Sequence, residues 1–148
     1  MSTTQKSIEI DLPVSTVYNQ WTQFEDFPHF MEGVERVTQL DDRRLRWVAE
    51  IAGAREEWDA EIVDQEPDRR ISWRSLSGTT NAGVVAFQPV GASSTRVTLD
   101  LHLEPKGLKE KTGEKLGLVP SQVEGDLKRF KKYIESRTVE TGARRATI

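Results

Sequence analysis

Between residues 34 and 105 the chain repeats one pattern, in which short stretches of alternating apolar and polar side chains are separated by turns. The turns are marked by Asp41-Asp42, Gly53, Pro67-Asp68, Gly78 and Gly91-Ala92-Ser93. Alternation with a period of two is typical of β-strands that bury one face. Parallel neighbours need crossovers of about a dozen residues or more, so these short connections predict six consecutive antiparallel strands.

The alternation also predicts which face of each strand is buried. An earlier strand is predicted over residues 7–12, where Ile8, Ile10 and Leu12 share one face. It brings the predicted sheet to seven strands. The opposite faces of the third and fourth strands are mostly charged. The inward sets of the third to seventh strands are Leu45, Trp47, Ala49 and Ile51; Trp58, Ala60 and Ile62; Ile71, Trp73 and Ser75; Gly83, Val85 and Phe87; and Val97, Leu99, Leu101 and Leu103.

Helical spacing replaces the alternation at two places. After Pro13, which breaks the first strand, apolar residues recur from Val14 to Phe24, with Ser15 placed to cap a short helix. Residues 25–33 follow as an apolar bend that carries Phe27, Phe30 and Met31. Pro120 suits the first turn of a long helix over residues 120–138, whose apolar stripe is Val123, Leu127, Phe130 and Ile134.

The length of 148 residues favours one domain, predicted over residues 1–138. Residues 106–118 are predicted as either a shorter helix or an ordered loop. Residues 139–148 are predicted to be a flexible tail.

Composition excludes several classes of function. A formal charge of −3 gives no basic field for nucleic acid, and the chain has no cysteine for disulfides or thiolate metal sites. His29 and His102 stand far apart, and both are interpreted as surface residues, so no metal is predicted. No glycine-rich phosphate loop is found, and no cofactor is predicted. Without an apolar signal region or a membrane-spanning run, we expect a cytoplasmic protein, either a monomer or a homodimer.

Three blocks of the sequence, FEDFPHFMEGVERVTQLDD at 24–42, RLRWVAEIAGAREEWDAEI at 44–62 and PDRRISWRSLSGTTNAGVVAF at 67–87, resemble the polyketide cyclase/dehydrase branch of the START-like (SRPBCC) superfamily. The order of the predicted elements resembles that superfamily over nearly the whole chain. The resemblance implies an α+β helix-grip fold: a curved seven-stranded antiparallel sheet, with two short helices after its first strand, wrapped around a long C-terminal helix. It also implies a cavity between sheet and helix.

Such a cavity would hold a largely apolar ligand. Trp47, Trp58 and Trp73 share the inward parity of three consecutive strands and offer flat surfaces to a planar molecule, although inward tryptophans also serve simply as core. Phe27, Phe30 and Met31 resemble the mobile entrance of the superfamily, or equally a plug that closes it. The full predicted ligand-binding set is Phe27, Phe30, Met31, Trp47, Trp58, Trp73, Ser75, Asn81, Phe87, Val123, Leu127 and Phe130.

Among inward polar residues, Glu56 alone is a candidate general base; the alternative is a carboxylate paired with Arg55 or with an arginine of a neighbouring strand. For Ser75 and Asn81 the alternative is hydrogen bonding to the backbone of the nearby turn.

Three functions remain open at this stage. The first is binding of a hydrophobic small molecule such as a lipid, a quinone or an aromatic polyketide, without covalent chemistry. The second is an aromatase/cyclase-type enzyme that closes rings on a poly-β-keto chain by aldol cyclisation or dehydration, with Glu56 assisting. The third is a protein-interaction module that uses the charged helix face formed by Lys128, Arg129, Lys131 and Lys132 beside Glu124 and Asp126.

Overall fold

The computed structural model describes residues 2–51, 53–104 and 113–148, and its strands form a seven-stranded antiparallel sheet. The order across the sheet is β1-β7-β6-β5-β4-β3-β2, so β1 alone leaves the chain order and pairs with the last strand. The predicted meander of six strands is confirmed. The strands are β1 (Ser2–Ile10), β2 (Val34–Gln39), β3 (Arg44–Ile51), β4 (Ala54–Glu66), β5 (Arg70–Gly78), β6 (Thr80–Gly91) and β7 (Ser94–Glu104).

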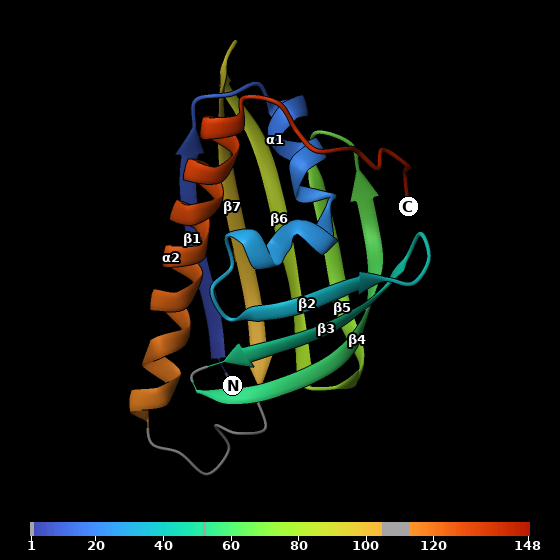
Figure 1. The fold of residues 1–148 in the computed structure, drawn as a ribbon, viewed down its shortest axis with the longest axis vertical. Helices are drawn as coiled ribbons and strands as arrows, with labels where there is room; N and C mark the ends of the chain where they lie inside the picture. Colours follow the sequence, from blue (N-terminus) through green and yellow to red (C-terminus); the bar gives the residue numbers. More distant parts are fainter. Residues whose placement is uncertain (1, 52, 105–112) are drawn as a thin grey trace.

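The sheet is strongly curved, so that β2 and β3 run across the direction of β1, β7 and β6 (Figure 1). Three helical segments accompany it: α1 (Val14–Trp21), the 3-10 helix η1 (Phe24–His29) and α2 (Gly113–Arg137). The long helix α2 stands beside β1, while α1 and η1 lie at the open side of the curve (Figure 1). This is the helix-grip arrangement that the resemblance implies.

The apolar stripe of α2 is buried as predicted, with Val123, Leu127, Phe130 and Ile134 between 0% and 6% exposed. The start of the helix differs from the prediction. It begins at Gly113, so residues 113–118 belong to α2 and Pro120 lies inside the helix rather than in its first turn. The rest of the segment left open between helix and loop lies outside the described residues. None of the described helices is both long enough and apolar enough to span a membrane.

Two local predictions near the N-terminus are wrong. Pro13 and not Ser15 occupies the N-cap of α1, and no side chain caps the helix. The strand predicted over residues 7–12 starts earlier, at Ser2, and ends at Ile10, because β1 pairs with β7 along nine successive positions. The predicted apolar bend is mostly the helix η1, which buries Phe24 and Phe27.

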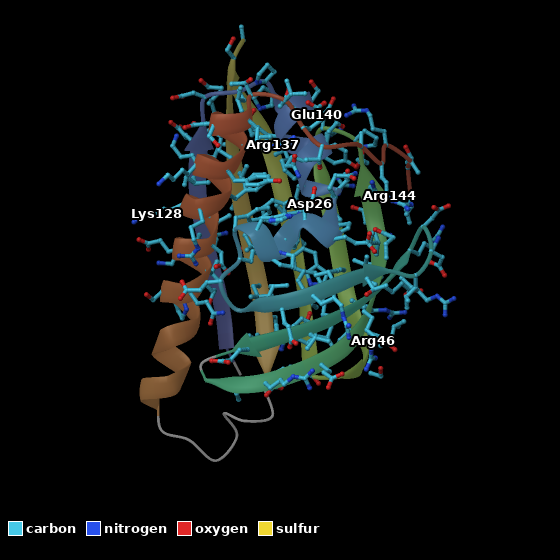
Figure 2. The ribbon with its side chains drawn as sticks, viewed as in Figure 1. Asp26, Arg46, Lys128, Arg137, Glu140 and Arg144 are labelled. Atoms are coloured by element: carbon cyan, nitrogen blue, oxygen red, sulfur yellow. The ribbon has the colours of Figure 1, made fainter. Side chains whose placement is uncertain are left out.

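The last residues of the chain, for which a flexible tail stays a prediction, make hydrogen bonds to the domain. Thr138 ends α2 with a positive φ of 62°, and the chain then crosses α1 toward β4 (Figure 1). The backbones of Ile148 and Gln65 exchange two hydrogen bonds, at 2.9 and 3.0 Å. Figure 2 places Glu140 and Arg144 near α1; Glu140 accepts a hydrogen bond from Asn19 at 2.9 Å. Composition alone does not reveal these long-range partners.

Arg145 attaches this tail through charge-assisted hydrogen bonds. Its guanidinium donates to both carboxylate oxygens of Asp68, at 2.9 and 2.8 Å, and to Asn19 at 2.6 Å, and it lies 5.4 Å from the centre of the Tyr18 ring. We expect Arg145→Gln to lower the free energy of unfolding by about 1 kcal/mol. A bidentate, charge-assisted pair contributes more to stability than an ordinary ion pair on the surface. Urea denaturation measures the change.

Lys132→Gln is the matched control, because Lys132 is exposed and the change removes the same charge. Equal stability of the two variants would mean that the Arg145 contacts add nothing to the stability of the fold.

Candidate functional site

A cavity of about 130 Å³ lies between the inner face of the sheet and α2. Strands β3 to β7 supply one wall, α2 supplies the opposite wall, and α1, η1 and the segment before β2 close the space between them. All four tryptophans of the chain line it: Trp21, Trp47, Trp58 and Trp73. The volume is similar to the ~150 Å³ apolar cavity that admits benzene. The space therefore accommodates about one ring in this conformation.

The sheet places the aromatic wall through its register. Trp47 of β3 and Trp58 of β4 are directly paired positions, and their rings stack with centroids 5.6 Å apart and planes 9° apart. Phe27 of η1 meets the Trp47 ring edge-on, with centroids also 5.6 Å apart. Such ring contacts add stabilisation beyond the burial of area.

Trp73 of β5 completes this wall because its partner across the sheet is a glycine. Trp73 pairs with Gly83 of β6, and a Cβ added at Gly83 would lie only 2.6 Å from the Trp73 ring. Any larger residue at position 83 would displace the ring. The glycine therefore sets the position of Trp73.

Eight of the predicted ligand-binding residues line the cavity, and four do not. Those that line it are Phe27, Met31, Trp47, Trp58, Trp73, Asn81, Val123 and Leu127. Those that lie outside the lining are Phe30, Ser75, Phe87 and Phe130.

The four residues outside the lining contact other protein groups instead. Phe130 meets Trp21 and Phe30 with ring centroids 5.0 Å away in both cases. Phe87 meets Tyr18 at 5.2 Å. These rings fill the end of the barrel beside α1. The alternation predicts which face of a strand a residue lies on, but not its position along the strand. The pattern therefore predicts these residues in the cavity lining together with those that do line it.

Ser75 and Asn81 make the turn-type hydrogen bonds that the sequence left as their alternative. The Asn81 backbone N–H donates to Ser75 Oγ at 3.0 Å, and Asn81 Nδ2 donates to the Thr79 carbonyl at 3.2 Å. Asn81 nevertheless presents a polar group to the cavity, whereas Ser75 does not line it.

Glu56, the candidate general base, does not line the cavity. Its side chain is buried, and the Thr79 hydroxyl donates a short hydrogen bond to its carboxylate. Arg55 forms ion pairs with Glu35 and Glu57, at 3.4 and 2.7 Å. Glu56 thus lies near the start of β4, outside the cavity lining, and its carboxylate is paired with the hydroxyl of Thr79, which lies between β5 and β6.

Two polar lining residues, Gln122 and Asp126, were missed by the sequence analysis. Both belong to α2 and flank its apolar stripe one position before Val123 and Leu127. The spacing of four residues, which puts two side chains on one helix face, was the available signal. The stripe was assigned from apolar residues alone, so its polar margin was not considered.

Asp126 has the most unusual environment of the lining residues. Its side chain is 14% exposed, and its Oδ1 accepts hydrogen bonds from Arg129 at 2.5 Å and from the Glu32 backbone N–H at 3.2 Å. Burial raises the pKa of the Asp126 carboxyl above its ordinary 3.8, although the Arg129 guanidinium and the Glu32 N–H act in the opposite direction. Arg129 also donates to the Phe30 carbonyl at 2.9 Å, so this cluster joins α2 to the segment after η1.

A contact between α2 and β3 lies where the cavity adjoins a second cleft. Gln122 Nε2 donates to the Glu50 carbonyl at 3.2 Å and lies against Gly33, where an added Cβ would come within 2.2 Å of it. Outside this contact a wider polar cleft shares Gly33, Val34, Ala49 and Gln122 with the cavity. The Gln122 amide therefore stands between the apolar space and the exterior.

Most of the charged side chains on the helix face considered for protein interaction form ion pairs or hydrogen bonds within the protein. Lys131 donates to the Glu9 carbonyl at 2.7 Å and pairs with Glu135 at 2.9 Å, and Lys128 pairs with Glu124 at 3.2 Å. Lys128 points away from the sheet (Figure 2). Within residues 2–51, 53–104 and 113–148, no three His, Asp or Glu side chains form a group suited to a metal ion.

Comparisons with known proteins agree with this geometry. The model of a family described as polyketide cyclase/dehydrase and lipid transport matches residues 10–132. An uncharacterized 17.2 kDa protein of Streptomyces lincolnensis is 48% identical, covering 100% of this chain and 99% of its own length.

Two solved structures share the fold. A START superfamily protein from Mycobacterium smegmatis has a TM-score of 0.81 at 18% identity, over 93% of this chain and 99% of that one. The Zhui aromatase/cyclase from Streptomyces sp. R1128 has a TM-score of 0.75 at 18% identity, over 96% and 98%.

The raised pKa of Asp126 predicts a pH-dependent stability with a definite sign. Well below pH 3.8 the Asp126 carboxyl is protonated in both the folded and the unfolded protein. As the pH rises, the unfolded protein releases this proton first, so the stability that the folded protein gains by holding it is lost as the pH passes through the raised pKa of the folded state. The free energy of unfolding of the wild type, minus that of Asp126→Asn, should therefore fall as the pH rises over this window. Urea denaturation from pH 3.5 to pH 7 measures it.

Glu124→Gln on the same helix is a control of opposite sign. Hydrogen bonds from Lys128 and Lys6 lower the pKa of Glu124 below its ordinary 4.5, so its contribution is present above that value and is lost as the pH falls. A difference of the same sign for both variants would contradict the assignment of Asp126.

Proposed function

The chain belongs to the polyketide cyclase/dehydrase and lipid transport family, and from this premise we propose that it encloses a hydrophobic small molecule between its sheet and α2. The observation that carries the proposal is the lining of the cavity, in which polar side chains are confined to Asn81, Gln122 and Asp126 among the described residues. An apolar space with a few placed polar groups is the usual form of a small-molecule site. Binding needs no covalent step.

The size of the cavity limits which ligands it can enclose. A volume of about 130 Å³ favours a ring over a long acyl chain, unless the mouth beside Gln122 opens. A quinone or an aromatic polyketide would place one ring against the tryptophan wall. The cytoplasmic location expected from the sequence stays a prediction.

Native mass spectrometry of gently purified protein is the first test. Its denatured extract identifies any apolar adduct retained from the host. A titration with the one-ring probe 1,4-benzoquinone provides the second test, because all four tryptophans line the cavity and should be quenched together. The absence of cysteine removes the thiols that commonly react with this probe.

A substitution that fills the cavity should remove this binding. Leu101 of β7 lines the cavity, and Leu101→Phe places a ring in a space of about one ring. We expect the affinity for 1,4-benzoquinone to fall by about ten-fold or more, equivalent to ~1.4 kcal/mol of lost binding free energy. Fluorescence quenching measures the dissociation constant.

Leu76→Phe supplies the matched control, since Leu76 is 48% exposed on β5 and lies outside the lining. Saturable quenching that is unchanged in Leu101→Phe would place the quinone elsewhere on the protein.

A cyclase-type activity is the second candidate, and one observation favours it. Asp126 is a carboxyl in the cavity wall with a pKa raised by burial, as suits a group that exchanges protons with a bound substrate. This reading assigns the acid–base role to Asp126 instead of Glu56. The cavity would also hold the reacting carbons of a poly-β-keto chain together.

If the chain is a cyclase, Asp126→Asn should lower kcat by about 10²-fold or more, the usual contribution of general acid–base catalysis, while the affinity for an unreactive analogue is retained. Product formation from a short poly-β-ketone, followed by chromatography, measures the rate. Glu124→Gln on the outer face of α2 is the control. Equal rates in the presence and absence of wild-type protein would leave binding as the only function.

A further inference from the structure

Three polar side chains at the C-terminal end of α1 are buried. Asn19, Gln20 and Thr22 are 9%, 0% and 1% exposed. Buried polar groups are nearly always hydrogen-bonded, because an unpaired one destabilises the fold. Here the partners come from the far end of the chain: residues 139–148 cross α1 and form hydrogen bonds with all three side chains (Figure 1).

Gln20 is bound to this segment through both atoms of its side-chain amide. Its Oε1 accepts from the Thr141 backbone N–H at 2.9 Å, and its Nε2 donates to the Thr141 hydroxyl at 3.2 Å. The Thr141 hydroxyl in turn donates to the Asp26 carboxylate of η1, which also accepts from Gln20 Nε2 at 3.3 Å. Thr141 therefore ties α1 to η1.

Two further hydrogen bonds hold the backbone of this segment. The Arg144 N–H donates to the Thr22 hydroxyl at 2.9 Å, and the Arg144 carbonyl accepts from Gln65 Nε2 at 2.9 Å. Gln65 is 3% exposed, and its Nε2 also donates to the hydroxyl of the buried Tyr18 at 2.8 Å. Buried side chains that bind the backbone of another segment fix the path of that segment across them.

The elements held by this segment are among those that close the cavity. Trp21 of α1 and Phe24 and Phe27 of η1 line the cavity, and Asp26, which accepts from Thr141, lies between the last two in the sequence. A molecule that enters on this side must displace α1 or η1 from the sheet. Such a displacement breaks the hydrogen bonds of Thr141, so the segment 139–148 opposes it.

We propose that residues 139–148 act as a latch, which holds α1 and η1 over the cavity and so sets the rate at which a ligand enters and leaves. The inference rests on the proposed ligand-enclosing function and adds a means of controlling it. Movements of loops and lids commonly limit the exchange of enclosed ligands. Weakening the latch raises the population of the open form, and it leaves unchanged the closed form, which determines the equilibrium affinity.

Glu140→Ala/Thr141→Ala/Arg145→Gln removes side-chain hydrogen bonds of the latch and leaves the buried residues of α1 in place. We expect the association and dissociation rate constants of 1,4-benzoquinone both to rise about ten-fold, as the loss of one or two hydrogen bonds allows, while the dissociation constant changes by less than about two-fold. Stopped-flow tryptophan fluorescence measures the rates, since all four tryptophans line the cavity.

Glu9→Ala/Thr98→Ala/Arg96→Gln is the matched control, because it makes the same three changes at hydrogen-bonded side chains of β1 and β7. Glu9 accepts from Arg96 at 2.8 Å, and Thr98 shares a hydrogen bond with Ser7 at 3.2 Å. None of these four residues lines the cavity, so the control should keep the wild-type rates. An equal rise of the rates in both triple variants would mean that general destabilisation speeds the exchange, and it would overturn the latch.

Hydrogen exchange tests the latch without a ligand. In the wild type, the amide protons of Thr141 and Arg144 should be protected, since they donate to the side chains of Gln20 and Thr22. In the latch variant, the amides of α1 and η1 should exchange about ten-fold faster, and those of β6 and β7 at the wild-type rate. Exchange of the Thr141 and Arg144 amides at the rate of an unstructured peptide would support the flexible tail predicted from the sequence and overturn the latch, whether or not the variant folds.

The outcomes separate the latch from the function on which it rests. Wild-type rates of 1,4-benzoquinone exchange in the latch variant overturn the latch while the ligand-enclosing function stands; faster exchange in Gln122→Ala would then place the entrance beside α2. If the wild type binds no 1,4-benzoquinone and carries no adduct in native mass spectrometry, the ligand-enclosing function fails, and the latch loses its role in ligand exchange with it.

Discussion

The packing of Phe130 against Trp21 and Phe30 holds the other parts of the structure in place. These three rings come from α2, α1 and the end of η1, which share no sheet hydrogen bonds, and the two centroid distances are 5.0 Å. Burial of large aromatic rings is among the largest stabilising contributions available to a chain of this size. The rings fill one end of the curved sheet and fix α2 there. Further along α2, Val123 and Leu127 face the tryptophan wall across the cavity. The cavity thus depends on how firmly the filled end positions the helix.

Much of this architecture could be predicted from the sequence, because period-two and helical patterns report directly on burial. Trp58, Ala60 and Ile62 share a face in the alternation, and all three are buried. The stripe from Val123 to Ile134 was equally informative. The alternation does not predict where along the buried face of a strand a residue lies. Phe87 and Phe130 have the same inward parity as the lining residues, yet they meet other rings, and only the curvature of the sheet and the placement of α1 separate the two groups.

The polar contacts were harder to predict, since each depends on a partner distant in sequence. The tail illustrates the difficulty: Arg145 looks like a terminal surface charge, and its partners Asp68 and Asn19 are brought to it by the fold. Glu56 is a similar case. Its inward parity was correct, but the hydroxyl of Thr79, between β5 and β6, is hydrogen-bonded to its carboxylate, and Glu56 does not line the cavity. The sequence does not distinguish Asp126 from the many charged residues on the outer face of the same helix.

Glu56, Asp126 and Trp47 show how differently polar groups are accommodated inside this largely apolar fold. A buried polar group must be paired or must carry a penalty, and the penalty exceeds the net gain from an ordinary hydrogen bond. Glu56 receives the Thr79 hydroxyl, and Asp126 receives Arg129 and a backbone N–H, so both are compensated within the protein. Trp47 Nε1 is compensated by nothing in the described chain, and its ring is held between Trp58 and Phe27. A buried donor without an acceptor lowers the stability of the folded protein, so the stacking of the Trp47 ring must outweigh that cost.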